Sequence, residues 1–410
     1  MDLTSLIVTI IKVAVVMGGI MTAAAYFVLL ERRVAAWVQD RRGPNRVGIP
    51  LTRIRLFGLG QPLADGLKMI LKEEYTPSHV DRRLFVLAPL VIMAAALSVF
   101  AVLPFGSVLP ALPQLGINQP IQLVIAPQLD VAMIYVFALS SIAVYGVILG
   151  GWASNSKYSF LGGLRSSAQM IAYELPLGLG ILGVVLATGS LRLTDIIQAQ
   201  ADGAWFVLLQ PLGFIVFLVA AFAEAGRLPF DLPECEQELI GGYHTEYSGM
   251  KLVLYLTAEF IHMITASFLI TILFLGGWHL PWITEATGEI GWGVAILRIL
   301  VLFAKTFAMI FLFMLIRWSW PRFRFDQLMS LAWKVMLPLG VLNFLTVAIL
   351  MELRHPSLMG DSFGLVSVGF FGWLVAIVGW FIVAACRPLI TDNRPKRDVR
   401  KYEVDAQVHH

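Results

Sequence analysis

Residues 224–260 read EAGRLPFDLPECEQELIGGYHTEYSGMKLVLYLTAEF, a run of carboxylates that follows one long apolar stretch and ends inside another. The carboxylates are Glu224, Asp231, Glu234, Glu236, Glu238, Glu246 and Glu259, against the cations Arg227 and Lys251. A charged side chain at the centre of a membrane helix costs about 2.5–3.5 kcal/mol on insertion scales. A chain that keeps so many acids beside apolar stretches is expected to perform proton- or electron-coupled chemistry rather than simple anchoring.

The composition of the chain is typical of a membrane protein. Of its 410 residues, 58% are hydrophobic and 14% are charged, and the mean hydropathy is +0.78. Soluble domains carry about 25% charged residues. Because no polar segment is long enough for a soluble domain, we expect one transmembrane domain over residues 1–386 and a basic cytoplasmic tail over residues 387–410.

Nine stretches are long and apolar enough to cross a bilayer as helices, which takes about 20 residues each. They cover residues 3–30, 84–104, 130–151, 164–188, 204–223, 250–276, 294–317, 332–351 and 365–386. The alternation of a membrane β-barrel is absent, and otherwise only helices satisfy the backbone hydrogen bonds inside lipid. The sequence therefore predicts an all-α polytopic membrane protein with about nine transmembrane helices.

The distribution of basic residues predicts the orientation. If the first span begins outside, the inner segments hold 25 of the 30 lysines and arginines. These segments are 31–83, 151–165, 224–251, 317–334 and 387–410. Lysine and arginine are concentrated in the cytoplasmic loops of membrane proteins, so we expect the N-terminus outside and the C-terminus inside.

The first inner segment contains a candidate surface helix at residues 62–74. Its apolar residues repeat with helical spacing, at Leu63, Leu67, Ile70 and Leu71. Lysines and glutamates fall on the opposite side of this helix. The pattern is typical of an amphipathic helix that lies along the cytoplasmic surface of the membrane.

A turn rich in arginine precedes this helix, in QDRRGPNRVGIP at residues 39–50. Arg41, Arg42 and Arg46 exceed what a topology signal needs. We expect them to bind lipid phosphate or to pair with the acidic segment 224–246, which lies on the same side in the predicted orientation. The spacing matches neither a Walker A nor a GxGxxG motif, so neither a nucleotide site nor a nucleic-acid partner is expected.

Ionisable residues inside the predicted spans are candidate proton sites. Glu174 lies in the fourth span, and Glu259 shares a helix face with Tyr255 and His262. Buried carboxyl groups of this kind are candidates for proton exchange. We therefore expect Glu174, Glu259 and Lys305 to take part in proton coupling, with a static ion pair between Glu259 and Lys305 as the alternative. A single Glu–His pair is too little to predict a metal site.

The loop RWSWPRFRFDQLMSLAWKVMLP at residues 317–338 alternates basic and aromatic side chains. Its charged residues near the start are Arg317, Arg322, Arg324 and Asp326. Interfacial tryptophan and arginine lie at the level of lipid headgroups. The alternative is a buried arginine–aspartate network that ties the loop to its acidic neighbour or to another subunit.

Five motifs, spread over roughly residues 10–350, carry a family resemblance. They are ERRVAAWVQDRRGPNRVG, QPLADGLKMILKEEYTP, RSSAQMIAYELPLGLGIL, AEAGRLPFDLPECEQELIGGYHTEYSGMKL and RWSWPRFRFDQLMSLAWKVMLP. In these motifs and their order, the chain resembles the H subunit of bacterial NADH:quinone oxidoreductase, the counterpart of mitochondrial complex I subunit 1. It departs from the usual pattern at Ala225–Gly226 and at Cys235, and neither departure removes a charged position.

The resemblance implies a place in a respiratory complex of the bacterial cytoplasmic membrane. Members of this family form most of the quinone chamber and couple quinone reduction to proton translocation. The implied substrate is ubiquinone or menaquinone. The implied partners are the quinone-site subunits of the hydrophilic arm, the small membrane subunits leading to the antiporter-like subunits, and membrane lipids. No catalytic redox centre, flavin, iron–sulfur cluster or metal is expected in this chain, which agrees with its isolated cysteines, Cys235 and Cys386.

The resemblance also implies roles for individual residues. An arginine turn, a surface helix and an acidic loop border the quinone chamber. The corresponding residues are Arg41, Arg42, Arg46, Asp65, Glu224, Arg227, Asp231, Glu234, Glu236, Glu238 and Glu246. A buried charge path toward the antiporter-like subunits begins at Glu174 and Glu259. The charged residues of the 317–338 loop brace the cytoplasmic side.

Two alternatives stay open. The first is the equivalent subunit of a membrane-bound hydrogenase or of another quinone-linked dehydrogenase, which partner subunits would distinguish. The second is a stand-alone secondary transporter, which predicts an inverted repeat with paired broken helices. We find no convincing internal repeat in the sequence.

Overall fold

The computed structural model describes residues 3–48, 57–111, 120–127, 129–231, 240–281, 283–284, 291–353 and 365–386. The described part of the chain is mostly helical. Its elements are α1 (Leu3–Val38), α2 (Gln61–Leu71), α3 (Arg82–Ser98), η1 (Val99–Ala101), β1 (Val108–Leu109), β2 (Ile121–Gln122), α4 (Ala132–Ala153), α5 (Lys157–Thr188), α6 (Leu193–Asp202), α7 (Phe206–Leu209), α8 (Pro211–Glu224), η3 (Gly242–His244), α10 (Gly249–Phe274), α11 (Trp292–Ser319), α12 (Phe325–Leu331), η4 (Ala332–Met336), α13 (Leu337–Leu353) and α14 (Leu365–Cys386). β1 and β2 form a short antiparallel ribbon.

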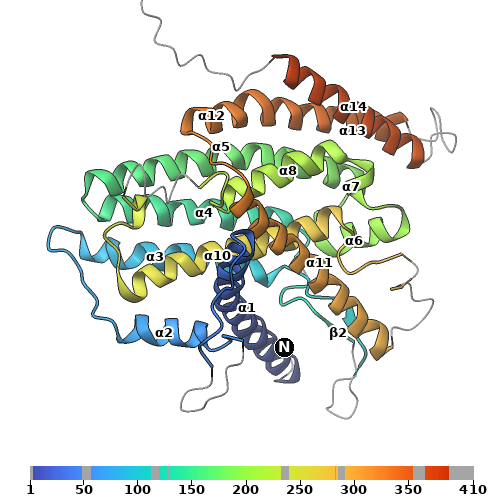
Figure 1. Ribbon diagram of the computed structural model, residues 1–410. Coiled ribbons are helices and arrows are strands. Elements are labelled where there is room, and N and C mark those ends of the chain that lie inside the picture. The colour runs from blue at the N-terminus through green and yellow to red at the C-terminus, as the bar shows by residue number, and fades with distance from the viewer. Residues whose placement is uncertain are drawn as a thin grey trace, which may run out of the picture.

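Most long helices run side by side in a layered bundle (Figure 1). α3 packs on α4, α4 on α5, and α5 on α8 and α13, while α14 packs on α13 and α8. α1 and α11 run obliquely across the bundle, and both contact α10 (Figure 1). α4 and α5 approach closely because small residues face each other: a Cβ on Gly151 would lie 2.8 Å from the carbonyl oxygen of Ser159.

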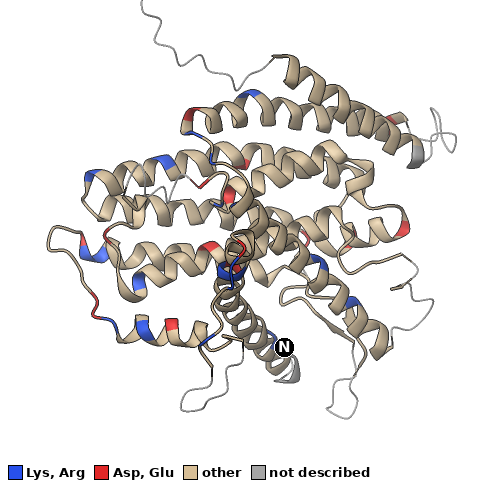
Figure 2. Ribbon diagram, viewed as in Figure 1, with Lys and Arg blue, Asp and Glu red and all other residues tan. Residues whose placement is uncertain are grey.

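α10 lies in the core of the bundle, and α1 and α14 lie at its edges. In the most apolar stretch of α10, 78% of the residues are buried, against 6% in α1 and 11% in α14. A helix that is apolar on all sides and buried belongs to the core, whereas exposed apolar faces need lipid or another protein. Charged residues gather toward helix ends and where α1 meets α11, and α14 carries none (Figure 2).

The predicted all-α polytopic membrane fold is confirmed, and each of the nine predicted stretches is helical in the structure. Among the described residues, eight helices are long and apolar enough to cross a membrane. The stretch 204–223 differs, because α7 ends at Leu209 and a new helix begins at Pro211. Proline lacks an amide hydrogen and is favoured in the first turn of a helix, so the chain restarts there. The predicted tail 387–410 lies outside the described residues.

Two differences at helix ends matter for the site. α1 continues to Val38 rather than ending at residue 30, which places Glu31 inside a helix. The predicted surface helix is α2, which begins at Gln61 and ends at Leu71. It buries no side chain within the described chain, and its four predicted apolar residues are all exposed. This exposure fits a helix whose apolar face lies on a membrane or a partner.

Candidate functional site

A cavity of about 1060 Å³ lies between the end of α1, the arginine turn, the start of α2, α10 and the end of α11. Its apolar wall includes Val28, Ala35, Leu256 and Phe260. Among the described residues, its charged wall consists of six arginines and two glutamates, Arg32, Arg41, Arg42, Arg46, Arg227, Arg317, Glu31 and Glu259. A cavity with one apolar and one cationic wall suits an amphiphile with an electron-rich polar head.

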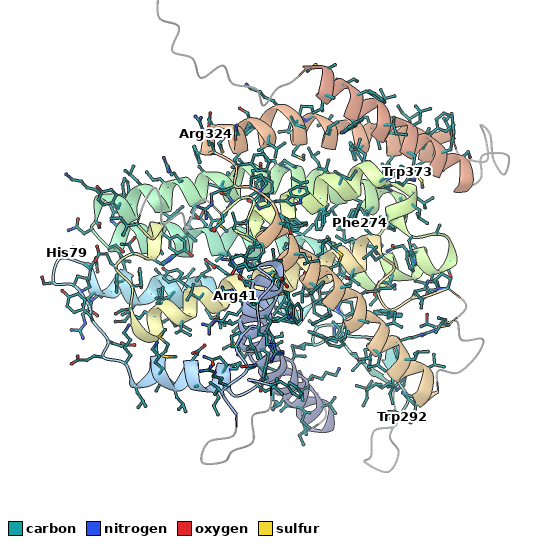
Figure 3. The ribbon with its side chains drawn as sticks, in the orientation of Figure 1. Arg41, His79, Phe274, Trp292, Arg324 and Trp373 are labelled. Atoms are coloured by element: carbon teal, nitrogen blue, oxygen red, sulfur yellow. The ribbon has the colours of Figure 1, made fainter. Side chains whose placement is uncertain are left out.

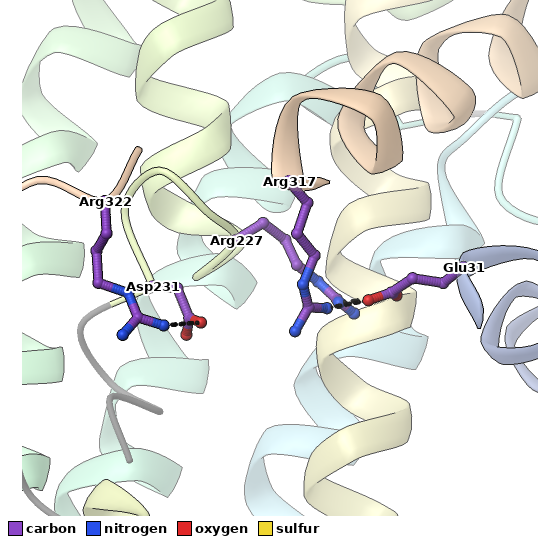
Figure 4. A network of polar contacts seen from close by, with 5 residues as sticks. All are labelled: Glu31, Arg227, Asp231, Arg317 and Arg322. Carbon is purple, nitrogen blue, oxygen red and sulfur yellow. Dashed lines mark hydrogen bonds and ion pairs between the residues drawn. The ribbon is translucent and has the colours of Figure 1, made fainter. Parts of the chain in front are cut away.

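Glu31 holds two of these arginines in place (Figure 4). Its carboxylate accepts a hydrogen bond from Arg227 Nη1 at 3.1 Å and another from Arg317 Nη1. Glu31 and Arg227 are only 7% and 4% exposed, so both charges are removed from water. Arg227 also lies over the ring of Phe260, 4.2 Å from its centroid, in a cation–π contact. The triad thus joins α1, the acidic segment and the end of α11.

A second ion pair lies beside this triad (Figure 4). Arg322 Nη2 is 3.2 Å from Asp231 Oδ2, and Asp231 is buried. Close by, the backbone amide of Phe323 donates to the carbonyl of Pro229 at 3.1 Å. The loop after α11 is therefore tied to the acidic segment by a charge pair and a backbone bond, which is the arginine–aspartate alternative that the sequence offered.

The arginine turn lies at the cavity. Arg41 (Figure 3), Arg42 and Arg46 all line it. Within the described residues, none of the three forms an ion pair with the acidic segment. Asp65 instead binds Arg32 Nη1 at 2.8 Å and thereby ties α2 to α1. The turn can therefore offer guanidinium groups to a ligand in the cavity.

The remaining predicted residues of the two loops, where the structure describes them, lie away from the cavity. Arg324 and Asp326 pair with each other at 3.2 Å near the start of α12 (Figure 3), with side chains 58% and 42% exposed. Exposed pairs of this kind contribute about 0–1 kcal/mol. Glu246 is half-buried in the loop before α10 and does not line the cavity. The other predicted acids, Glu234, Glu236 and Glu238, lie outside the described residues.

Glu259 connects the cavity to the loop before α10. Its carboxylate accepts a hydrogen bond from the Tyr243 hydroxyl at 3.2 Å. The loop crosses α5 at Gly162, where a Cβ would lie 2.7 Å from the backbone of Gly242, which has φ +63°. Both positions therefore favour glycine. Burial raises the pKa of Tyr247 in the same loop to about 12, so its hydroxyl stays protonated at neutral pH.

A second group of carboxylates lies between α4, α5 and α8. Ser140 donates a hydrogen bond to Glu224, and its neighbour Ser141 donates one to Glu174. The two carboxylates lie close enough for their charges to interact. Glu224 thus points toward the serines of α4 and does not line the arginine-lined cavity. The adjacent hydroxyls of α4 can each donate or accept a hydrogen bond, so the group can share protons.

Lys305 contacts the C-terminal end of α10, far from Glu259. Its Nζ donates to the carbonyls of Leu275 and His279, each at 2.6 Å, and lies 4.4 Å from the ring centroid of Trp205. Glu259 precedes Leu275 by sixteen residues, which is about 24 Å at 1.5 Å per residue. The static Glu259–Lys305 pair is therefore absent, and Lys305 neutralises the negative end of the α10 dipole.

Comparison with known proteins establishes the family. A family model described as NADH dehydrogenase matches residues 11–348. An NADH-quinone oxidoreductase H subunit of Geobacter metallireducens is 47% identical over 343 residues, which cover 84% of this chain and 96% of the relative. The chain belongs to the family of NADH-quinone oxidoreductase H subunits.

Other members of the H-subunit family agree with this assignment. An H subunit of Cytophaga hutchinsonii is 48% identical over 322 residues, covering 78% of this chain and 90% of the relative. The H subunit of Flavobacterium psychrophilum is 43% identical over 350 residues, covering 85% and 98%. The predicted family resemblance is confirmed. With its long apolar helices, this H-subunit family member is a multi-pass protein of the bacterial inner membrane.

Sequence reasoning on this H-subunit family member missed three residues of the site. Glu31 follows the apolar part of the first span, and so it was assigned to a loop. The segment ERRVAAWV contains neither glycine nor proline, and this absence of helix breakers could have indicated that α1 continues. Ser140 and Ser141 are consecutive serines in an apolar helix, and their carboxylate partners come from elements far away in sequence.

Proposed function

We propose that this chain forms a wall of the quinone chamber in an NADH-quinone oxidoreductase and couples quinone reduction to proton movement through its buried carboxylates. The observation that carries the proposal is the arginine-lined cavity with Glu31 and Glu259 in its wall. Its volume of about 1060 Å³ lies at the upper limit of small-molecule sites. The relatives are named as subunits of a quinone-reducing NADH enzyme.

The two walls of the cavity have different tasks in this proposal. The apolar wall, with Leu256 and Phe260, contacts the quinone ring and the start of its tail. The guanidinium groups of Arg41, Arg42 and Arg46 donate hydrogen bonds toward the carbonyl oxygens and balance the negative charge that reduction brings. Electrons arrive from partner subunits, and this chain orients the quinone.

Proton coupling is proposed to start at Glu259. Reduction of a quinone to a quinol takes up two electrons and two protons, so the charge in the chamber changes during turnover. Glu259 lies in the cavity wall, and the Glu224–Glu174 pair lies deeper in the bundle. A proton change at Glu259 shifts the protonation of this pair. Lys305 bonds the carbonyls of Leu275 and His279 at the C-terminal end of α10. We therefore do not include Lys305 in this path.

The segment 224–250 is the proposed two-state element of the coupling. Coupling between sites needs an element with two arrangements that both sites bias. The described parts of this segment contact charged residues of α1, α10 and the loop after α11. Arg227 binds Glu31, Asp231 binds Arg322, and Tyr243 binds Glu259. Rearrangement of this segment would therefore alter the cavity and the buried carboxylates together.

The proposed partners are the quinone-site subunits of the hydrophilic arm, the small membrane subunits and membrane lipids. The exposed apolar faces of α1, α2 and α14 need such cover. The orientation with the N-terminus outside belongs to this proposal, since it places the arginine turn and the acidic segment on the cytoplasmic side. The names of the relatives favour this enzyme over a hydrogenase-type assembly or a stand-alone transporter.

Filling the cavity tests the proposal. Leu256→Trp places an indole at the cavity wall, so the KM of NADH:quinone reductase activity for a short-chain quinone should rise about tenfold, equivalent to about 1.4 kcal/mol. Ferricyanide reduction by NADH, which bypasses the chamber, should stay unchanged. Leu300→Trp is the matched control, because Leu300 is 60% exposed on α11. An unchanged KM in assembled Leu256→Trp complex would contradict the proposal.

A further inference from the structure

A small cavity of about 20 Å³ lies in the interior between η1, α4, α5, α8 and α10. Glu224 and Ser140 line it from α8 and α4, and His262 lines it from α10. Much of the remaining lining is apolar and includes Val136 and Phe217. A cavity above about 10–15 Å³ can hold a water molecule when polar groups face it, so this one has room for a single water.

His262 has an unmet hydrogen-bonding need at this cavity. Its Nε2 is buried and forms no hydrogen bond within the described residues. Nearly all buried polar atoms bond to protein or to ordered water. Thr265, which also lines the cavity, already donates its hydroxyl to the Ile261 carbonyl at 3.0 Å. Among the described residues, Glu224 and His262 are therefore the ionisable groups that face this water site.

His262 also lies between the two groups of carboxylates. It follows Glu259 by three residues on α10, so the two side chains are neighbours on the helix surface. Glu259 lines the arginine-lined cavity, whereas Glu224 is joined to Glu174 through the consecutive serines of α4. A bridge from His262 to Glu224 would therefore connect the quinone cavity with the deeper pair.

We infer that His262 and one water in this small cavity form the proton link between Glu259 and the Glu224–Glu174 pair, an inference that rests on the proposed function. A proton from the Glu224 carboxyl passes to the water, which gives one of its own protons to His262 Nε2. The imidazolium then releases a proton from its other ring nitrogen toward Glu259. One proton moves and no electron does. Imidazole suits this role because each nitrogen can accept or donate.

Two substitutions separate a relay from a structural role. His262→Leu removes the polar group, and His262→Gln keeps a hydrogen-bonding amide that does not take up a proton near neutral pH. A relay predicts that both variants lose coupled quinone reduction and proton translocation by about tenfold or more, because proton-transfer groups typically contribute about 10²–10⁴-fold. A structural role predicts that His262→Gln behaves as wild type, and this result would overturn the inference.

The assay uses the whole complex in membrane vesicles, with ferricyanide reduction by NADH to normalise for assembly. Thr271→Val is the control on the same helix, because its buried hydroxyl bonds only the Ser267 carbonyl at 2.8 Å among the described residues. A cryo-EM map of the intact wild-type complex that resolves waters gives a second test. Because it needs no substitution, a folding defect cannot affect its result. A water bonded to both Nε2 and Glu224 is expected, and a clearly empty cavity would overturn the link.

Parallel variants distinguish this inference from the proposed function. Glu224→Gln and Glu259→Gln should each lose coupled activity if the buried carboxylates couple quinone reduction to proton movement. Wild-type coupled activity in both carboxylate variants would contradict the proposed function and, with it, the inference. Loss of coupled activity in both carboxylate variants, with full activity in His262→Gln, would contradict only the proposed histidine link.

Discussion

Glu31→Gln tests whether one carboxylate holds the wall of the arginine-lined cavity together. The substitution keeps the size of the side chain and removes its charge. Arg227 and Arg317 then face a neutral amide, next to the further arginines of the cavity wall. We expect the junction between α1, the acidic segment and the end of α11 to loosen as a result.

The expected magnitude follows from the geometry of the triad. The Arg227–Glu31 contact is 3.1 Å long, and both side chains are at most 10% exposed. Two unit charges about 4 Å apart attract by about 4 kcal/mol at an effective dielectric constant of about 20. Arg317 is 19% exposed, so water offsets part of its loss. We therefore expect a total loss of about 3–5 kcal/mol, the range for breaking a buried pair.

The assay is the thermal inactivation of quinone reductase activity in the detergent-solubilised complex, together with the amount of assembled complex on a native gel. Glu31→Gln should inactivate much faster than wild type. The double variant Glu31→Gln/Arg317→Gln should lose less than the two single variants combined, because the two substitutions remove the two halves of one ion pair.

Asp326→Asn serves as the control, since its partner Arg324 is exposed and the pair should contribute at most about 1 kcal/mol. Two results would refute the reasoning. One is strict additivity of the Glu31 and Arg317 substitutions. The other is a Glu31→Gln complex no less stable than Asp326→Asn.

Three further substitutions probe the other contacts. Lys305→Met leaves two carbonyls at the end of α10 without their donor and should destabilise the complex by about 1–3 kcal/mol, seen as faster inactivation on heating. Asp231→Asn should free the loop after α11, measured as increased proteolysis near Arg322, and wild-type proteolysis would contradict this. Ser140→Ala removes the donor to Glu224 and should lower quinone reduction several-fold without changing ferricyanide reduction; equal losses in both assays would contradict it.

The fold could be predicted from the sequence because each long apolar stretch must be a helix in lipid. Helix ends were harder to predict, since hydropathy marks where apolar residues stop and not where backbone hydrogen bonding stops. Glu31 shows the difference: it ends the apolar run, yet α1 continues to Val38, and Arg227 and Arg317 neutralise its charge. The break before Pro211 was predictable in principle from proline chemistry.

The site could be predicted only as a set of residue types. The arginine turn and Glu259 line the same cavity, although the sequence places the turn in a loop and Glu259 inside a span. The partners of each charge depend on how α1 and α11 cross α10, and no spacing along the chain encodes that crossing. Glu224 was assigned to the acidic loop by its neighbours in sequence. In the structure it ends α8 and binds Ser140, whose helix lies far away in sequence.

Two kinds of contact hold the carboxylates inside the bundle, arginine ion pairs and hydroxyl hydrogen bonds, and they differ in what protonation would cost. Glu31 and Asp231 are ion-paired with arginines, so protonating either would break an ion pair whose carboxylate is buried. Glu174, Glu224 and Glu259 accept hydrogen bonds from serine or tyrosine hydroxyls. A hydroxyl can turn to accept a bond from a protonated carboxyl group as readily as it donates to a carboxylate. We therefore expect protons to move along the hydroxyl-bonded carboxylates, while the ion-paired ones keep the cavity in shape.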